Sequence, residues 1–473
     1  MKRVSGVILL ALVASCTAGP KYHLPASAVA LKPAARTAFV NGGEAEFAQA
    51  PLPDHWWRLY DDDRLDSYVR EALAANTDLR AADANLRRAT FAIREAQAAK
   101  TVTSTLLASL VDTRQGIIFP FPDFNYLLGA ALTYPLDLAG GLRRTIEAAR
   151  ADAASMEATR DQVRVTVAAA VARNYVAVCW ANRSIAAAQY VVAVQSKTLE
   201  EVRRLFEGGR DTAFDVTRAQ TAVEQSAAAI PPLIAQRQAA LYALAALMGR
   251  PIANYPRELQ DCSAPPRLRA PLPIGDGAAL IRRRSDIRAA ERGLAAATAK
   301  IGVQTALLYP QVTLAALAGP AGPFSPIGQG FSFGGAAGPI MLWVYPNRSA
   351  ARARIAEAGA TAQAAEAQFD GAVLTALQQT ETALDAYVHE IAHNQELRRA
   401  RDSAAKASGQ AATLYRFGRT GLLDRLNAEA NLATAETAVA ASDASLADDQ
   451  VSVFLALGGG WEPESPPAIA APN

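Results

Sequence analysis

The sequence predicts a mainly α-helical protein built from two tandem repeats, each with a very long helical hairpin and a pair of strands for a membrane β-barrel. Three observations predict this fold class. The segments TDLRAADANL at 77–86 and SDIRAAERGL at 285–294 are closely similar. Residues 142–207 contain neither glycine nor proline. Residues 301–347 contain no Asp, Glu, Lys or Arg.

The first observation extends along the chain. FEGGRDTAFD at 206–215 is echoed by YRFGRTGLLD at 415–424, and GLRRTIEA at 141–148 by AARARIAE at 350–357. All three matches have nearly the same offset, whereas chance matches would scatter, so the pattern indicates a duplication. We therefore divide the chain into a signal peptide (1–15), an N-terminal arm (16–62), a first repeat (63–272), a second repeat (273–461) and a disordered tail (462–473).

The N-terminus combines the basic start MKR with the short apolar run VSGVILLALVAS. This pattern is typical of a secretory signal peptide and is too short for a membrane span. Cys16 follows LVAS as in a bacterial lipobox, so we expect it to be acylated. Thr17 then favours delivery to the outer membrane, because lipoproteins kept at the inner membrane carry Asp there. The alternative is an ordinary signal peptide with a chance cysteine.

Each repeat has the same predicted order of helices. An amphipathic helix at 77–99 or 285–306 comes first, and a charge-poor segment and a very long helix follow. Glycines at 208–209 and 418 end the long helices, since glycine accepts a positive φ. Returning helices are expected at 212–248 and 421–457, with a break at Pro231 and Pro232. Hairpins this long must pack side by side.

The charge-poor segments are too rich in glycine and proline for a transmembrane helix. They predict strands at about 106–113, 125–133, 311–318 and 330–338, with the weak alternation of membrane barrels. Four strands cannot seal their edges in lipid, so several chains must contribute; three chains give twelve strands. The alternative is a soluble hairpin that caps a helical bundle.

These features together resemble the outer-membrane efflux lipoproteins of the TolC/OprM/NodT type. The resemblance covers nearly the whole chain, and its motifs include YPLDLAGGLRRTIEAARAD, LMGRP, RRRSDIRAAE, YPQVTL and the terminal ALGGGW. It implies a homotrimer in which a twelve-stranded β-barrel continues into a twelve-helix periplasmic α-barrel. Such a protein is not an enzyme and needs no cofactor. It is a passive outer-membrane conduit for small molecules and drugs, gated at its helix tips.

The resemblance also implies partners and site residues. The partners are the lipid bilayer, a periplasmic adaptor protein and an inner-membrane transporter of the resistance-nodulation-division class, which supplies the energy. The gate residues are Asp215, Tyr415, Asp424 and Asn427, with an expected Asp215–Tyr415 hydrogen bond of about 1 kcal/mol. Thr420 replaces a latching arginine, and 347–349 replaces the usual Asp-Gly-Gly turn. The tips that dock the adaptor contain Phe206, Gly208, Gly209, Thr212, Gly418, Arg419 and Gly421.

Other interpretations remain open. His389-Glu-Ile-Ala-His393 matches the HExxH zinc signature, which would make the chain a periplasmic metallopeptidase. A type I secretion duct and a structural coiled-coil lipoprotein are further alternatives. Arg282–Arg284 is interpreted as a solvated turn and Cys179 as a core residue. No disulfide framework can be read from the three distant cysteines. The net charge of +2 gives no reason to expect a nucleic-acid partner.

Overall fold

The computed structural model describes residues 17–113, 123–262, 266, 268, 270–323, 332–345 and 348–459. They belong to two compact units. Unit 1 contains Met1–Ala28, Ala84–Ala158 and Arg288–Ala372, and unit 2 contains Val29–Asp83, Thr159–Ile287 and Val373–Asn473. Each unit therefore takes segments from both sequence copies. The predicted signal peptide, Cys16 and the tail 462–473 lie outside the described residues.

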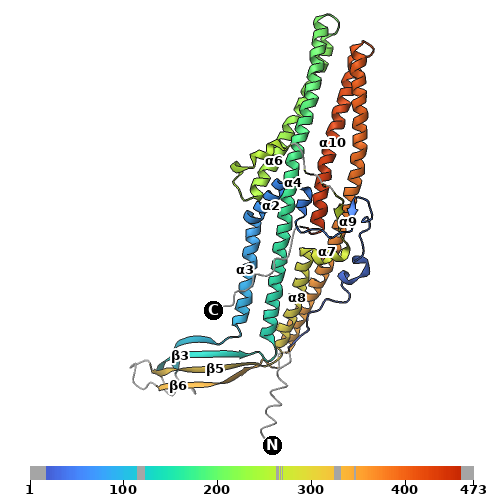
Figure 1. The fold of residues 1–473 in the computed structure, drawn as a ribbon. Helices are drawn as coiled ribbons and strands as arrows, with labels where there is room; N and C mark the ends of the chain where they lie inside the picture. The colour runs from blue at the N-terminus through green and yellow to red at the C-terminus, as the bar shows by residue number, and fades with distance from the viewer. Residues whose placement is uncertain are drawn as a thin grey trace. The chain divides into compact units, whose positions relative to one another are not determined.

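Helices make up most of the structure (Figure 1), and none of those described is both long and apolar enough to cross a membrane. The α-helices are α2 (Asp63–Ala75), α3 (Thr77–Ala98), α4 (Gly141–Glu207), α5 (Ala213–Ala228), α6 (Ile230–Leu247), α7 (Gly277–Arg283), α8 (Ser285–Ala306), α9 (Arg348–Arg416) and α10 (Leu422–Ala456). The strands are β1 (Phe47–Ala48), β2 (Thr103–Thr113), β3 (Asp123–Leu136), β4 (Leu272–Pro273), β5 (Gln311–Pro323) and β6 (Ser332–Leu342).

The predicted elements are confirmed, with small shifts at their ends. Helices α3 and α8 match the two expected amphipathic helices, and α4 and α9 match the two very long ones. The break expected at Pro231 and Pro232 falls at Ala229, between α5 and α6, because the prolines occupy the first turn of α6, where their missing N–H groups cost nothing. The strands extend further than expected, and β3 is the longest at 14 residues.

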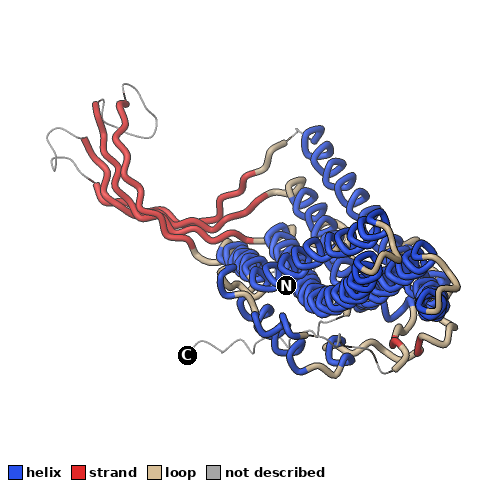
Figure 2. Tube along the Cα trace, turned by 90° about the horizontal axis from the view of Figure 1, so that it is seen from above, coloured by secondary structure: helices blue, strands red, loops and turns tan. Residues whose placement is uncertain are grey.

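Unit 1 contains a four-stranded antiparallel sheet in the order β2-β3-β5-β6, whose strands lie side by side in Figure 2. Strands β3 and β5 form the central pair, so the sheet joins the two sequence copies. Within the described strands, β2 and β6 each pair on one side only. The sheet therefore ends in two unpaired edges.

The register separates the side chains into two faces, because successive residues of a strand point to opposite sides. One face, here called the leucine face, carries exposed apolar side chains from all four strands: Leu106, Leu110, Leu128, Leu132, Tyr134, Leu314, Phe333 and Met341. The opposite face carries Thr103, Thr105, Ser109, Thr133 and Thr313, mixed with small and apolar residues. The two faces differ in composition but not completely, because Leu107, Leu317, Ile340 and Leu342 on the opposite face are also exposed.

Unit 2 preserves the duplication in its helix ends. Asn76 begins α3 by accepting hydrogen bonds from the backbone N–H groups of Asp78 and Leu79, and its amide donates to the carbonyl of Leu247 near the end of α6. In the second copy, Arg284 precedes α8 and donates to the carbonyl of Ala456, the equivalent residue of α10. Different side chains thus make the same connection in the two copies.

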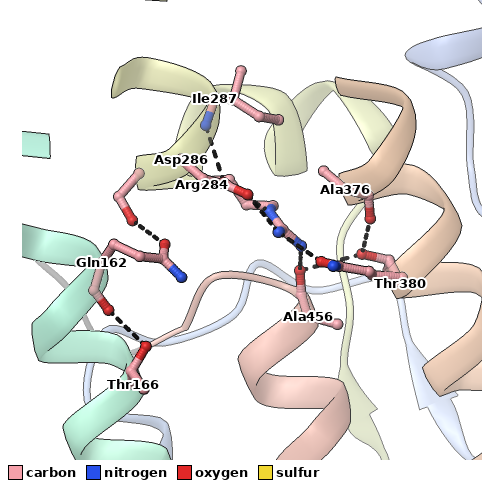
Figure 3. Close-up of polar contacts among 10 residues, drawn as sticks. Gln162, Thr166, Arg284, Asp286, Ile287, Ala376, Thr380 and Ala456 are labelled. Carbon is pink, nitrogen blue, oxygen red and sulfur yellow. Dashed lines mark hydrogen bonds and ion pairs between the residues drawn. The ribbon is translucent and has the colours of Figure 1, made fainter. Parts of the chain in front are cut away.

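Arg284 is buried, which corrects the interpretation of Arg282–Arg284 as a solvated turn. Its guanidinium contacts both carboxylate oxygens of Asp286 and the amide oxygen of Gln379, and the hydroxyl of Thr380 donates to the carbonyl of Ala456 (Figure 3). The guanidinium is buried at low cost because acceptors surround it. Arg284 therefore holds the end of α10, whereas Arg282 in the same run is exposed to solvent.

The hairpin of α9 and α10 has a polar seam, defined by three paired positions spaced seven residues apart on each helix. The amide of Gln450 donates to the Tyr387 hydroxyl at 3.2 Å. The amide of Asn394 donates to Asp443 at 2.8 Å. Arg401 and Glu436 form an ion pair at 3.5 Å, which is the third contact of the seam. The seven-residue period favours a left-handed supercoil. The equivalent positions of α4 are apolar: Val178, Ile185 and Val192.

Candidate functional site

The tips of the two hairpins lie in unit 2 and end in the same local structure. In the first, the N–H of Arg210 bonds to the carbonyl of Leu205 at 2.8 Å, and Gly209 has φ +70°. In the second, the N–H of Arg419 bonds to the carbonyl of Leu414 at 2.8 Å, and Gly418 has φ +67°. Both are Schellman turns, which need glycine because a side chain disfavours positive φ. The predicted glycine-centred turns are confirmed.

The prediction that Tyr415 bonds to Asp215 is wrong, because Tyr415 bonds to a different aspartate. The Tyr415 hydroxyl donates to Oδ2 of Asp211 at 3.0 Å. Asp215 is occupied by a capping box, because its carboxylate accepts from the hydroxyl of Thr212 at 2.6 Å and its own N–H bonds to that hydroxyl. Burial, together with the hydrogen bond and charge of Asp211, raises the pKa of Tyr415 to about 12.

A buried ionic group beside this tyrosine was not predicted. We call it the Arg425 cluster: Arg425, Glu429, Glu201 and Thr198. The guanidinium donates to Glu429 at 3.0 Å, to Glu201 at 2.5 Å and to the Thr198 hydroxyl at 2.8 Å. It also lies 5.3 Å from the centre of the Tyr415 ring, within cation–π range. Burial alone would lower the pKa of Arg425, but the bonds and charges of Glu201 and Glu429 raise it.

The Arg425 cluster joins α4 to α10 on the edge of an apolar contact between the two hairpins. Leu199, Val202, Ala219 and Leu422 form that contact, with Tyr415 packed against it. The Glu–Arg spacing of four residues in α10 was the available sequence signal, since it places Arg425 and Glu429 on one helix face. No sequence pattern indicated that Glu201 pairs with Arg425, because this contact depends on how α4 and α10 pack.

The remaining predicted gate residues stay near the surface. Asp424 accepts from the hydroxyl of Thr420 at 2.6 Å, and Asn427 and Arg419 are exposed. Gly421 occupies the N-cap of α10 and Gly208 closes the last turn of α4. The tips also present exposed aromatic side chains, from Phe206, Phe214 and Phe417.

The HExxH motif lies on α9 in unit 2 without the surroundings of a zinc site. His389 and His393 are exposed, and their contacts are with Asp385 and Glu390 on the same helix. Glu390 also accepts from the hydroxyl of Ser442 on α10. No three potential metal ligands gather anywhere in the part of the chain that the structure describes.

Unit 2 also contains a cavity of about 530 Å³ between α4, the break between α5 and α6, and α10. Alanines dominate its wall, and Arg173 and Asp448 form an ion pair across it. The space arises because the chain turns at Ala229 and small side chains face the gap. The Nε1 atom of Trp180, which lines the cavity, is buried without a hydrogen-bond partner.

Two of the three cysteines form a disulfide that the sequence did not predict. Cys179 in α4 bonds to Cys262 after α6, 83 residues further on. Asn182 supports the link by donating to the carbonyls of Leu259 and Cys262. Cys179 is indeed buried, as predicted, but its role as a half-cystine was missed because the distance between two cysteines in sequence does not reveal their distance in the fold.

Comparison with known proteins agrees with this architecture. The profile of the outer membrane efflux protein family matches residues 68–250 and 278–459. Nodulation protein T of Rhizobium leguminosarum bv. trifolii is 28% identical over 463 residues, which cover 96% of each chain. The probable efflux pump outer membrane protein TtgC of Pseudomonas putida is 27% identical, over 95% of this chain and 94% of its own.

Solved structures show the same fold. The outer-membrane channel OprN superposes with a TM-score of 0.86 at 31% sequence identity, over 94% of this chain and all of the other. The open-state MtrE channel of Neisseria gonorrhoeae superposes with a TM-score of 0.78 at 25% identity, over 94% of this chain and 98% of the other. The fold is therefore the combined α-barrel and β-barrel fold of these channels. The chain belongs to the outer membrane efflux protein family, as a protein of the outer membrane with a transport role and no enzymatic one.

Proposed function

We propose that three copies of this chain form a passive conduit across the outer membrane, through which small molecules leave the periplasm. The single observation that carries this proposal is the sheet with two unpaired edges. Its strands contain 11 to 14 residues, whereas about 9–11 residues span a bilayer. Unpaired backbone groups are too costly in lipid, so β2 of one copy must pair with β6 of the next.

The two faces of the sheet support this arrangement. The leucine face would contact lipid, and the face with threonines would line the pore. Trp343 and Tyr345 follow directly after β6 with ring centres 5.0 Å apart, and both are exposed. Tryptophan and tyrosine favour the boundary between lipid and water, so they would mark the periplasmic edge of the membrane. Acylation of Cys16 would add a second hold on the same membrane.

The hairpin tips would be both the gate and the docking surface. Tyr415, Asp211 and the Arg425 cluster join the two hairpins of one chain, so we expect them to keep the tips closed. The exposed phenylalanines of the tip segments add apolar surface there, which suits a periplasmic adaptor protein. Among the relatives, TtgC is named as an efflux pump protein, and OpmQ of Pseudomonas aeruginosa as a pyoverdine export protein. By analogy, an inner-membrane transporter of the resistance-nodulation-division class would supply energy and choose the cargo.

The test combines cross-linking with conductance. Cysteine pairs scanned along β2 and β6 should link different chains and give a ladder that stops at three. A control pair at Ala131 and Leu317, which are register partners in β3 and β5, should link only within one chain. Reconstituted protein should conduct ions in a planar bilayer. A ladder that stops at two, or a protein without conductance after the tips are opened by mutation, would refute the conduit.

A further inference from the structure

We infer that Arg144 is the centre of a docking site for the residues that follow Cys16, and that this site fixes Thr17, Ala18 and Gly19 against the turn between β3 and α4. The guanidinium donates from Nε to the carbonyl of Ala18 at 3.0 Å and from Nη2 to the carbonyl of Gly19 at 3.0 Å. Its third contact is with Glu147 at 2.8 Å. Arg144 is only 2% exposed.

The turn itself forms the other side of the site. The N–H of Ala18 donates to the carbonyl of Ala139 at 2.9 Å, so Ala18 is held through both of its backbone polar groups. Thr17 lies against Gly140, where a Cβ atom would come within 2.7 Å of the threonine methyl group. These contacts hold the chain from its first described residue onward.

Glycines leave the space that the segment fills. A Cβ atom on Gly302 of α8 would lie 2.8 Å from the carbonyl oxygen of Ala18 and 2.8 Å from the Arg144 side chain. Gly19 has φ +78°, and a Cβ atom there would lie 2.5 Å from the backbone of Gly302. The close crossing of two backbones needs glycine on both sides.

The buried guanidinium indicates that the site requires its occupant. The carbonyls of Ala18 and Gly19 are two of the three acceptors of the buried guanidinium, and they offset the cost of burying its charge. The duplication shows that the repeat itself does not need this residue. The second copy conserves Arg143 as Arg352 and Ile146 as Ile355, but the position of Arg144 is Ala353.

The consequence for the membrane anchor rests on the proposed acylation of Cys16. Thr17, the residue that follows Cys16 in the sequence, lies against Gly140 at the turn between β3 and α4. The lipid would therefore leave the protein at one fixed place beside the sheet, instead of at the end of a loose tether. The lipid anchor would position the sheet in the bilayer as well as attach the protein to the membrane.

Hydrogen exchange of the N-terminal peptide in the purified full-length protein tests the docking site. We expect Arg144→Gln and Gly302→Ala to increase the exchange rate of the Ala18 amide at least tenfold. Arg150→Gln and Gly293→Ala are matched controls, because Arg150 is exposed on α4 and a Cβ atom on Gly293 of α8 meets nothing within 4 Å. Unchanged exchange in Gly302→Ala would overturn the site even if Arg144→Gln failed to fold.

A second arm separates the docking site from the acylation. A Cys16→Ser chain, exported with a non-lipoprotein signal peptide, should retain slow exchange at Ala18, because the contacts are made by protein atoms. Fast exchange in this chain would mean that the lipid holds the segment, and would overturn the site. Mass spectrometry of the native N-terminal peptide should show the added acyl groups. Their absence would overturn the fixed anchor but leave the docking site standing.

Discussion

Replacing Arg425 by methionine should open the proposed gate. The substitution keeps the length of an unbranched side chain but removes the three donors that hold Glu429, Glu201 and Thr198. The carboxylate of Glu429, whose side chain is only 4% exposed, then keeps the Thr198 hydroxyl as its one donor in the cluster. The contact between α4 and α10 at the tips should weaken accordingly.

The expected size of the effect of Arg425→Met follows from the burial of the ion pair between Arg425 and Glu429. Removal of one partner from a buried ion pair costs about 3–5 kcal/mol, since the other charge remains buried. Glu201 contributes less, because its side chain is 46% exposed. At about 1.4 kcal/mol per factor of ten, the balance between closed and open tips should shift by roughly 100- to 3,000-fold.

Single-channel recordings in planar bilayers measure that shift as a rise in open probability. Arg419→Met is the control, because Arg419 is exposed at the same tip and should leave the open probability unchanged. The double variant Arg425→Met with Glu429→Leu should close the channel again, since an apolar pair of similar volume can replace a buried ion pair. If Arg425→Met leaves a folded trimer with unchanged opening, the cluster is not part of the gate.

Three further outcomes follow from the structure. Tyr415→Phe should raise the open probability about fivefold, because the lost hydrogen bond contributes about 1 kcal/mol. The pKa of Tyr415 is raised to about 12, so the wild-type hydrogen bond should be fully present below pH 10 and lost as the pH rises through 12. A titration of conductance against pH measures this loss. Replacing Cys179 and Cys262 by serine should lower the free energy of unfolding of the helical part by up to about 4.5 kcal/mol, from the 83-residue loop that the disulfide closes, and equal melting curves with and without reductant would contradict it. Gly418→Ala should cost about 1–2 kcal/mol in a thermal melt, whereas Gly421→Ala, at φ −82°, should not.

The sequence predicted the features that depend on local residues. The absence of glycine from 142–207 and the glycines of the two tips each act within one element, so helices and turns followed directly. The offset of 208–209 residues gave the repeat order. The strand pairs were also found, but their faces were not. Leu106 and Leu132 join one apolar surface only when the register aligns β2 with β3.

The missed features depend on distance in space. Tyr415 has two aspartates within reach, and the capping box that occupies Asp215 leaves Asp211 as its partner. Arg284 sits in a basic run that looks solvated, yet the end of α10 covers it. Neither of these hydrogen-bond partners can be predicted from residue types alone, because each lies in another part of the fold.

The polar seam of α9 and α10 has a consequence for errors during folding. A slide of one helical turn along this hairpin would place Asn394 and Arg401 opposite the wrong residues, so misaligned forms are strongly penalised. The matching stretch of α4 offers Val178, Ile185 and Val192, for which neighbouring alignments are nearly equivalent. That half carries the covalent cross-link at Cys179 instead. The two copies of the duplicated segment thus keep their helices aligned by different means, the polar seam in the second copy and the disulfide in the first. Only the first copy should misalign when the protein matures in a reducing environment.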